Sequence, residues 1–243
     1  MAAPTSRPVD WTVSPGLTPY TDSVAAMEAA VARIAAGEAP EQVWLLEHPP
    51  LYTAGTSAKD ADLLDPGRLP LFRTGRGGQI TYHGPGQRIA YVMLHLARRG
   101  LGPREYVERL ERWLIAALAE LGVEAVCRRE RVGIWVPRGD GREEKIAAIG
   151  VRVRRGVAFH GIALNVAPDL SHYEAIIPCG IREHGVTSLA ALGHPMAMAA
   201  IDEALRRAFE VTFGTATVDA PSGNSQITPP GGEQIHGAAT VPL

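Results

Sequence analysis

Three segments of the chain carry hydrophobic residues at the spacing of three and four positions that is typical of amphipathic helices. They are residues 22–36, 104–121 and 198–213. The second segment is preceded by Pro103 and followed by Gly122. Proline suits the first turn of a helix and glycine its C-terminal cap, so both ends of this helix are marked in the sequence.

Short apolar runs between these segments predict β-strands. Residues 42–47 form one run, and residues 80–96 contain two runs that are separated by the strong turn signal Gly84-Pro85-Gly86. Two or three further strands are expected up to Pro137. Residues 145–166 then read as two strands that join near Arg155-Gly156.

Hairpins combined with helices predict an α+β domain built on a mostly antiparallel sheet. We expect this domain to cover residues 1–214 and to include a loop at 51–70. From residue 215 the composition shifts to Gly, Pro, Ser and Thr without periodicity. Residues 215–243 are therefore predicted to form a disordered tail.

Composition narrows the range of functions and locations. The net charge of −2 argues against a general nucleic-acid binder. No apolar segment resembles a signal peptide or reaches the length of a membrane span, so a cytoplasmic protein is expected. Cys127 and Cys179 do not make a disulfide framework. We find no motif for a metal and expect no cofactor.

Lysine is rare in this chain, where Lys59 and Lys145 are the two lysines among 24 basic residues. Lys59 lies in a polar turn and is typical of a surface residue. Lys145 opens the apolar stretch Lys145-Ile146-Ala147-Ala148-Ile149-Gly150. Arginine keeps its proton permanently, whereas a buried lysine can act as an acid or a base. Chance in an arginine-rich chain explains the same count equally well.

Cys179 follows an apolar run and Pro178 and is followed by Gly180. This order can present a thiol at the end of an element, with room for a ligand at the glycine backbone. The thiolate is the reactive form, and a neighbouring ammonium group would lower the thiol pKa. A small buried hydrophobic residue is the usual fate of a lone cysteine, and Cys127 fits that description better.

The glycine-rich stretch 76–86 lets backbone amides approach an acyl or phosphate group closely, although tight turns explain most such runs. No Gly-Lys-Ser/Thr follows, so the stretch is not a Walker loop. His83, which lies beside the turn of this stretch, suits a catalytic role and a structural role equally well. Strand alternation puts His160 on the same face as Ile162 and Leu164. On such an apolar face, a buried histidine with satisfied hydrogen bonds is commoner than a catalytic one.

Four separated blocks of sequence resemble the signature of the lipoyl(octanoyl) transferase family. They are Arg-Gly-Gly-Gln-Ile-Thr-Tyr-His-Gly-Pro-Gly-Gln at 76–87, Lys-Ile-Ala-Ala-Ile-Gly at 145–150, Phe-His-Gly-Ile-Ala-Leu-Asn-Val at 159–166 and Ile-Pro-Cys-Gly at 177–180. The resemblance runs from about Trp44 to Leu189 in the family's order and spacing. The first twenty residues and the tail fall outside it.

The resemblance implies a single domain with a central mixed sheet flanked by helices, as in biotin and lipoate protein ligases. It implies transfer of an octanoyl or lipoyl group from acyl carrier protein, through a cysteine thioester, to a lysine of a lipoyl domain. The implied acceptors are the lipoyl domains of 2-oxoacid dehydrogenase complexes and the glycine cleavage H protein. No cofactor is implied, and a monomer is favoured.

The resemblance also implies roles for individual residues. Cys179 is the implied nucleophile, and Lys145 is the residue that lowers its pKa. The implied contacts with the acyl chain come from Arg76, Gly77, Gly78, Gln79, Ile80, Thr81, Tyr82, His83, Ala148, Ile149, Gly150, Gly161, Ile162 and Ala163. We expect Ile149, Ile162 and Tyr82 to form walls of the acyl slot.

Three other functions compete with this interpretation. An ATP-dependent lipoate ligase would need ATP and free acid, but no nucleophilic cysteine. A cysteine hydrolase would have to admit water, and no Cys-His-Asn order is evident. A non-catalytic module for lipoyl domains or carrier proteins would bind without a covalent adduct.

The two arginine clusters at 128–131 and 152–155 are interpreted as a solvated surface or as a docking patch for an acidic partner.

Overall fold

The computed structural model describes residues 7–177 and 185–220 as helices around two sheets. The larger sheet has nine strands, and eight of them follow the order β12-β1-β2-β6-β10-β9-β8-β7, while β11 pairs with β9. The smaller sheet has the order β4-β3-β5. The strands are β1 (Val9–Leu17), β2 (Gln42–Glu47), β3 (Leu51–Ala54), β4 (Leu71–Arg73), β5 (Ile80–His83), β6 (Gln87–His95), β7 (Val126–Arg128), β8 (Arg131–Pro137), β9 (Glu143–Arg154), β10 (Val157–Asn165), β11 (Gly185–Val186) and β12 (Thr217–Asp219).

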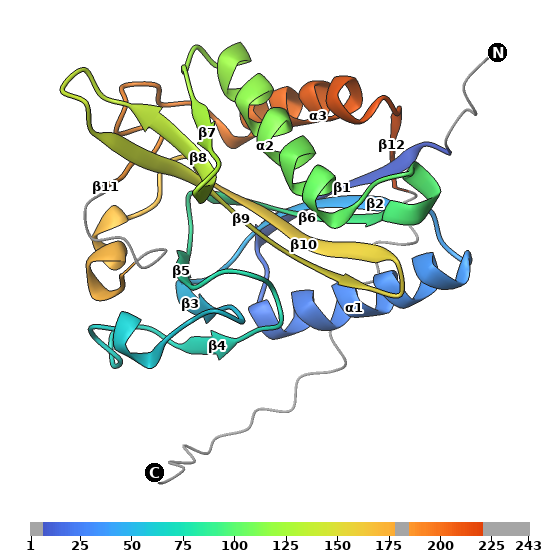
Figure 1. Ribbon diagram of the computed structural model, residues 1–243, viewed down its shortest axis with the longest axis horizontal. Helices are drawn as coiled ribbons and strands as arrows, with labels where there is room; N and C mark the ends of the chain where they lie inside the picture. Colours follow the sequence, from blue (N-terminus) through green and yellow to red (C-terminus); the bar gives the residue numbers. More distant parts are fainter. Residues whose placement is uncertain (1–6, 178–184, 221–243) are drawn as a thin grey trace, which may run out of the picture.

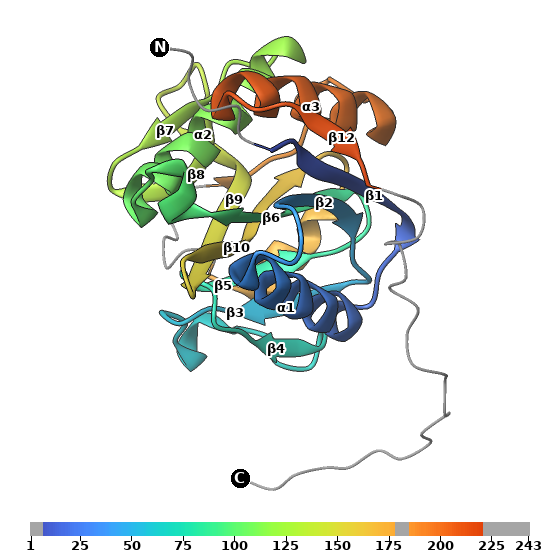
Figure 2. The same ribbon diagram turned by 90° about the vertical axis from the view of Figure 1, so that its right-hand side faces the viewer.

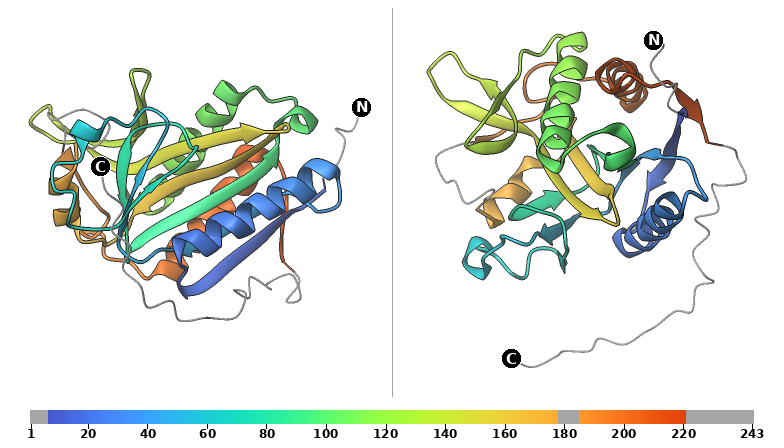
Figure 3. Two further views of the ribbon diagram at one scale, coloured as in Figure 1. Left: turned by 90° about the horizontal axis from the view of Figure 1, so that it is seen from below. Right: turned by 45° about the vertical axis from the view of Figure 1, so that its right-hand side comes forward.

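Helices cover both faces of the large sheet (Figures 1 and 2). Two helices, α2 (Pro103–Glu120) and α3 (Met198–Phe213), pack against one face, and α1 (Tyr20–Ala36) packs against the other. Figure 3 shows α1 lying along the strands, with the small sheet beside one end of the large one. The described residues also contain three short 3-10 helices, which are η1 (Asp60–Asp62), η2 (Leu96–Arg99) and η3 (Leu170–Ala175).

The predicted α+β class with a mixed, mostly antiparallel sheet is confirmed. Strands β2, β6, β10, β9, β8 and β7 pair antiparallel in succession, whereas β1 pairs in parallel with both β2 and β12. Because β2, β6 and β10 are buried on both faces, their sequences are nearly continuous apolar runs.

The core has three parts. One cluster lies under α2 and α3 and includes Trp113 and Phe209, whose rings meet edge to face with centroids 5.4 Å apart. A second cluster lies under α1 and includes Trp44 and Tyr91. The third joins the small sheet to η3, through Tyr52 and Tyr82 among others. The space between the second and third clusters is where the candidate site lies.

The C-terminal boundary of the domain stays a prediction. Strand β12 (Thr217–Asp219) lies beyond residue 214 and pairs with β1, so the sheet extends into the stretch that the composition assigned to the tail. Residues 221–243 lie outside the described part of the chain.

Candidate active site

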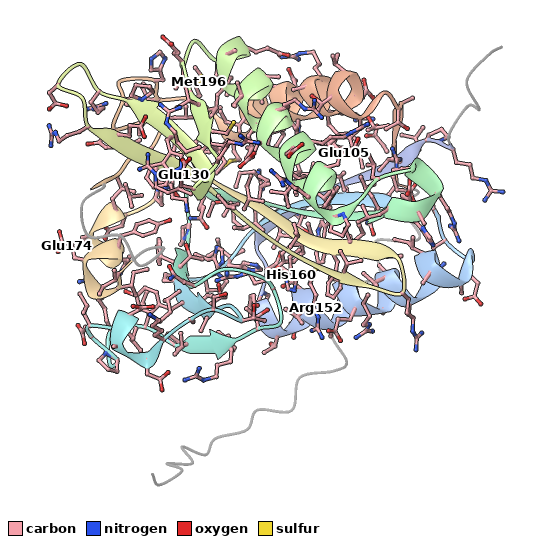
Figure 4. All side chains as sticks on the ribbon, viewed as in Figure 1. Glu105, Glu130, Arg152, His160, Glu174 and Met196 are labelled. Carbon is pink, nitrogen blue, oxygen red and sulfur yellow. The ribbon has the colours of Figure 1, made fainter. Side chains whose placement is uncertain are left out.

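A cavity of about 270 Å³ lies between the large sheet and the segment that leads into β5. Strands β6, β9 and β10 contribute its sheet wall, and the 76–83 segment contributes the opposite wall. Its lining is Tyr20, His48, Thr53, Ser57, Arg76, Gly78, Gln79, Ile80, Thr81, His83, Ile89, Tyr91, Glu130, Arg131, Val132, Lys145, Ala148, Ile149, Gly150, His160, Gly161, Ile162 and Ala163. Figure 4 marks Glu130 and His160 of this lining.

The structure brings together most of the residues that the sequence singled out for acyl contacts. All of them line the cavity except Gly77 and Tyr82. The Gly77 amide instead donates to the Val151 carbonyl at 3.0 Å and ties the loop to β9. The Tyr82 ring packs among Tyr52, His172 and Tyr173, so this side chain belongs to the third core cluster and does not form a cavity wall.

Lys145 lines the same cavity and is only 7 % exposed. Its ammonium nitrogen lies over the Trp135 ring, 5.4 Å from the ring centroid. Such contacts between a cation and an aromatic face are attractive, and more so when water is excluded. A lysine is therefore held at the wall of an otherwise largely apolar and aromatic slot.

Arg76 acts as a clamp for the loop that carries it. Its Nη2 donates to the Thr53 carbonyl at 2.7 Å, to Thr53 Oγ1 at 2.8 Å and to the Gln79 carbonyl at 2.9 Å. Its Nη1 donates to the Gly77 carbonyl at 2.9 Å. The guanidinium group thus fixes the loop against β3, and its hydrophobic stem remains for the cavity wall.

His83 is locked in one tautomer by its neighbours. The Gln87 side-chain amide donates to Asn165 Oδ1 at 2.9 Å, so its carbonyl oxygen faces His83 Nδ1 at 2.7 Å and requires a proton there. His83 Nε2 then accepts from the Thr53 hydroxyl at 3.1 Å. Burial, assisted by His48 and Arg76, lowers the pKa of His83 from 6.5 to about 3. This histidine stays neutral and has both ring nitrogens occupied.

His48 and Tyr91 form a second polar pair that the sequence reasoning missed. His48 Nδ1 donates to the Thr18 carbonyl at 2.8 Å, so Nε2 accepts from the Tyr91 hydroxyl at 2.9 Å. Burial lowers the pKa of His48 to about 4. A histidine directly after a buried strand and before Pro49-Pro50 was a usable signal, but Tyr91 inside β6 carried none.

His160 does not follow the alternation that the sequence predicted. Its φ is +60° and that of Gly161 is +156°, so the strand turns locally, and the His160 ring meets Tyr91 at 6.1 Å instead of joining Ile162 in the first cluster. Left-handed backbone at a non-glycine residue is uncommon and marks a special site. Burial, followed by Arg76 and Arg152, lowers the pKa of His160 to about 4.

Cys179 and Gly180 lie outside the described residues. The chain returns to the described part directly beside the lysine: Val186 of β11 pairs with Lys145 of β9, and the Thr187 amide donates to the Lys145 carbonyl at 2.9 Å. Asn165 links this return to the His83 network, since its side chain donates to the Thr187 carbonyl at 3.0 Å.

The two arginine clusters are partly neutralised within the protein. Arg128 and Arg131 both pair with Glu143, and Arg131 does so at 2.5 Å. Arg154 approaches Glu28 at 3.8 Å, and Arg152 lies over the Phe159 ring at 5.9 Å. The charge available to a docking partner is therefore smaller than the sequence alone suggests.

Across residues 7–177 and 185–220, no group of three or more His, Cys, Asp or Glu side chains has an arrangement that could hold a metal ion. Within these ranges, no helix is both long and apolar enough to cross a membrane.

Comparison with known proteins gives consistent matches over most of the chain. A family model described as the lipoyl protein ligase A/B catalytic domain matches residues 19–210. The chain is 62% identical over 216 residues to an octanoyltransferase of Maricaulis maris, covering 88% of this chain and 96% of that one. It is 63% identical over 207 residues to an octanoyltransferase of Paramagnetospirillum magneticum, covering 85% and 98% of the two chains.

Solved structures with the same fold are more distant in sequence. A putative lipoate protein ligase from T. acidophilum with bound lipoic acid aligns with a TM-score of 0.67 at 17% identity, covering 90% of this chain and 92% of that one. A lipoate-protein ligase A bound with ATP aligns with the same TM-score at 16% identity, also over 90% and 92% of the chains. These likenesses establish the lipoate-ligase-like fold.

Proposed function

Because the chain belongs to the family of lipoyl protein ligase A/B catalytic domains, and its relatives at about 60% identity are octanoyltransferases, we propose that it transfers octanoyl groups through a thioester on Cys179. The acyltransferase activity in protein lipoylation follows from that identity. The identity of the donor, the covalent path and the roles of individual residues go beyond what that identity shows and are proposed here. The observation that carries it is the burial of Lys145 in the lining of the cavity.

The donor in this proposal is octanoyl-acyl carrier protein, and the acceptor is a lysine of a lipoyl domain, as in 2-oxoacid dehydrogenase complexes and the glycine cleavage H protein. The chain acts in the cytoplasm, since a two-cysteine composition suits a reducing compartment. Arg129 and Arg155 are exposed in the two arginine clusters and are candidates for contacts with acidic carrier proteins.

In the first half-reaction, the Cys179 thiolate attacks the thioester carbonyl carbon, and a new carbon–sulfur bond forms. The bond from that carbon to the phosphopantetheine sulfur breaks. The Lys145 ammonium group donates its proton to the departing thiolate, which leaves as a thiol. Lys145 is then neutral, and the octanoyl group is a thioester of Cys179.

In the second half-reaction, the neutral amine of the acceptor lysine attacks the enzyme thioester. An amide bond forms and the bond to Cys179 breaks, which restores the thiolate. The amine proton passes to neutral Lys145, which restores the ammonium group. Val186, which follows Cys179 in the sequence, pairs with Lys145 in the sheet. This pairing supports a shared role of Cys179 and Lys145 in the reaction.

The cavity suits the hydrocarbon part of the substrate. Ile80, Ile89, Ile149 and Ile162 supply apolar wall. Each buried methylene contributes about 0.8 kcal/mol, so six of them contribute roughly 5 kcal/mol of binding free energy. Since His48, His83 and His160 are neutral, they add polarity without charge to this slot.

The identity to octanoyltransferases weighs against the ATP-dependent ligase, because the ligase structures resemble this chain at only 16% to 17% identity. A requirement for ATP and free acid would favour the ligase. A non-catalytic binding module predicts complex formation without any adduct.

The test is mass spectrometry of the protein mixed with octanoyl-acyl carrier protein. We expect an octanoyl adduct on Cys179 in the wild type, and neither a stable thioester nor transfer in Cys179→Ser. Cys127→Ser is the matched control, because Cys127 is an exposed free thiol and not the buried structural residue that the sequence predicted. This variant should keep both adduct and activity. An adduct at another residue, or full transfer by Cys179→Ser, would overturn the proposal.

A further inference from the structure

Gly133 in β8 lies directly against the side chain of Lys145. Its φ is +126°, a conformation that L-residues rarely adopt. A Cβ atom on Gly133 would lie 2.5 Å from Lys145 Cε, 3.1 Å from Nζ and 2.8 Å from the Ala147 carbonyl oxygen. Because one of these neighbours is backbone, the collision cannot be relieved by the lysine alone. Only glycine at this position leaves room for the Lys145 side chain in its present conformation.

Trp135 lies on the other side of the Lys145 ammonium group. The ring is buried, and its Nε1 donates to the Arg131 carbonyl at 3.2 Å, which fixes the orientation of the indole. The Lys145 nitrogen lies over this ring at 5.4 Å. The ammonium group is therefore held between the Gly133 backbone and an aromatic face, and both come from the same strand.

Two irregularities in strand pairing produce this arrangement. Ile134 pairs with Ala147 and Trp135 pairs with Lys145, so Ile146 is an extra residue in β9. The bulge turns Lys145 to the cavity while Ile146 and Ala147 both enter the first core cluster. A second irregularity, between β7 and β8, contains Gly133.

Helix α2 anchors this second bulge. Burial raises the pKa of Glu111, and a hydrogen bond from the Gly133 backbone opposes this shift. A hydrogen bond to a partly buried carboxylate is stronger than an ordinary one, because the acceptor carries charge. The position of Gly133 is thus set by the helix as well as by the sheet.

We propose that Gly133, anchored by Glu111, is a positioning residue that holds the Lys145 ammonium group against Trp135 at the cavity wall. This inference rests on the proposed function in one respect, because it takes Lys145 as the acid and base of transfer. The geometric part can be tested without any transfer reaction.

The rarity of lysine makes the geometric test direct. Protein labelled with ¹³C and ¹⁵N in lysine gives signals from Lys59 and Lys145 alone, and Lys59→Arg assigns them. Protons that lie over an aromatic ring are shifted upfield, so the Lys145 ε-methylene signal should lie upfield of that of exposed Lys59. We expect Gly133→Ala to move the Lys145 signal towards the Lys59 position.

Gly141→Ala is the matched control for backbone strain. Gly141 lies in the turn between β8 and β9 with a φ of +82°, and a Cβ atom there meets nothing within 4 Å. This variant should leave the Lys145 signal and the transfer rate unchanged. In Gly133→Ala we expect kcat for transfer to fall by about 100-fold, as for a misplaced catalytic group, with little change in KM for the octanoyl donor.

Glu111 supplies a variant that leaves the glycine intact. Glu111→Ala removes the acceptor of the Gly133 amide and should shift the Lys145 signal and lower kcat, whereas Glu111→Gln keeps an acceptor and should recover both. Thermal unfolding of each variant identifies one that fails to fold, and Glu111→Ala with its Gln rescue then decides the question.

An unmoved Lys145 signal in folded Gly133→Ala or Glu111→Ala would overturn the inference. So would unchanged kcat in a variant whose signal has moved, provided that Lys145→Ala abolishes transfer. Undiminished transfer by Lys145→Ala would instead refute the proposed role of Lys145 and would also remove the catalytic part of this inference. The two failures are therefore distinguishable.

Discussion

At the scale of single residues, the chemistry of the cavity depends on which of its side chains carry charge. His48, His83 and His160 are neutral because burial lowers the pKa of each well below 6.5. The Arg76 guanidinium group donates to the backbone carbonyls of Gly77 and Gln79 in its own loop and of Thr53 in β3. Lys145 is a side chain of the lining whose chemistry suits proton exchange with a thiol and an amine.

This assignment predicts a difference between lysine and arginine at position 145. Lys145→Arg keeps a positive charge but cannot exchange its proton, so we expect kcat for octanoyl transfer to fall by about 100-fold, as for loss of a general acid–base group. Steady-state transfer to a lipoyl domain measures this. Lys59→Arg in the exposed turn is the control and should keep wild-type activity. Near-normal turnover of Lys145→Arg would mean that charge alone suffices.

The neutral histidines also predict how stability depends on pH. The pKa of His83 is about 3 in the folded protein and about 6.5 in the unfolded chain, so between these values the unfolded chain binds one more proton. The free energy of unfolding should therefore fall as the pH is lowered from about 6.5, by about 1.4 kcal/mol per pH unit for this histidine. Chemical denaturation at several pH values should give a correspondingly shallower dependence in His83→Gln. An unchanged slope would contradict the proposed neutral state.

At the scale of elements, sequence periodicity was informative wherever an element has one clearly apolar face. The three predicted helices are confirmed as α1, α2 and α3, and the two strands that join near Arg155-Gly156 are confirmed as the hairpin β9–β10. The two strands on either side of Gly84-Pro85-Gly86 are confirmed as β5 and β6, but they lie in different sheets, because β5 pairs with β3 whereas β6 pairs with β2 and β10. Strand β1 was not predicted, because it contains Pro15 and Gly16 and its second half is largely exposed. Strand β3 falls in the predicted loop, since four residues carry too little pattern to be recognised.

The loop that Arg76 clamps gives a prediction at this scale. Lysine has a single ammonium group and cannot reproduce the fork that reaches Thr53, Gly77 and Gln79 together. Arg76→Lys should loosen residues 74–79, which raises KM for the octanoyl donor and speeds amide hydrogen exchange at Thr56 and Ser57, whose amides bond to this loop. Arg73→Lys is the control, because Arg73 is 67 % exposed in its pair with Asp60. Exchange rates equal to wild type in Arg76→Lys would argue against the clamp.

At the scale of the whole molecule, the site is assembled by features that leave no trace in the sequence. Period-two alternation along β9 would put Lys145 on the same face as Ala147, and only the extra residue Ile146 turns it to the cavity. The positive φ of His160 reverses its direction in the same way. The motif blocks identified which residues meet, whereas the bulges and left-handed residues that aim them depend on tertiary packing.

A buried ion pair holds the α3 layer to the sheet behind this site. Arg88 of β6 and Asp202 of α3 meet at 2.8 Å, with side-chain exposures of 5 % and 14 %. Burial raises the pKa of Asp202 to about 6 although Arg88 opposes this, so desolvation outweighs the attraction of the pair. Such a pair fixes how two layers meet but adds little net stability.

Replacing the two partners separately and together should reveal this balance. Arg88→Met alone leaves the Asp202 carboxylate buried without its cation and should lower the free energy of unfolding by about 3–5 kcal/mol. The double variant Arg88→Met/Asp202→Leu removes both charges and should recover most of that loss, because two apolar side chains can pack where two desolvated charges stood. Denaturant unfolding at pH 7 measures both, and octanoyl transfer by the double variant reports whether the layers still meet correctly. A double variant no more stable than Arg88→Met would mean that the pair stabilises the fold in its own right, because the two losses would then not offset each other.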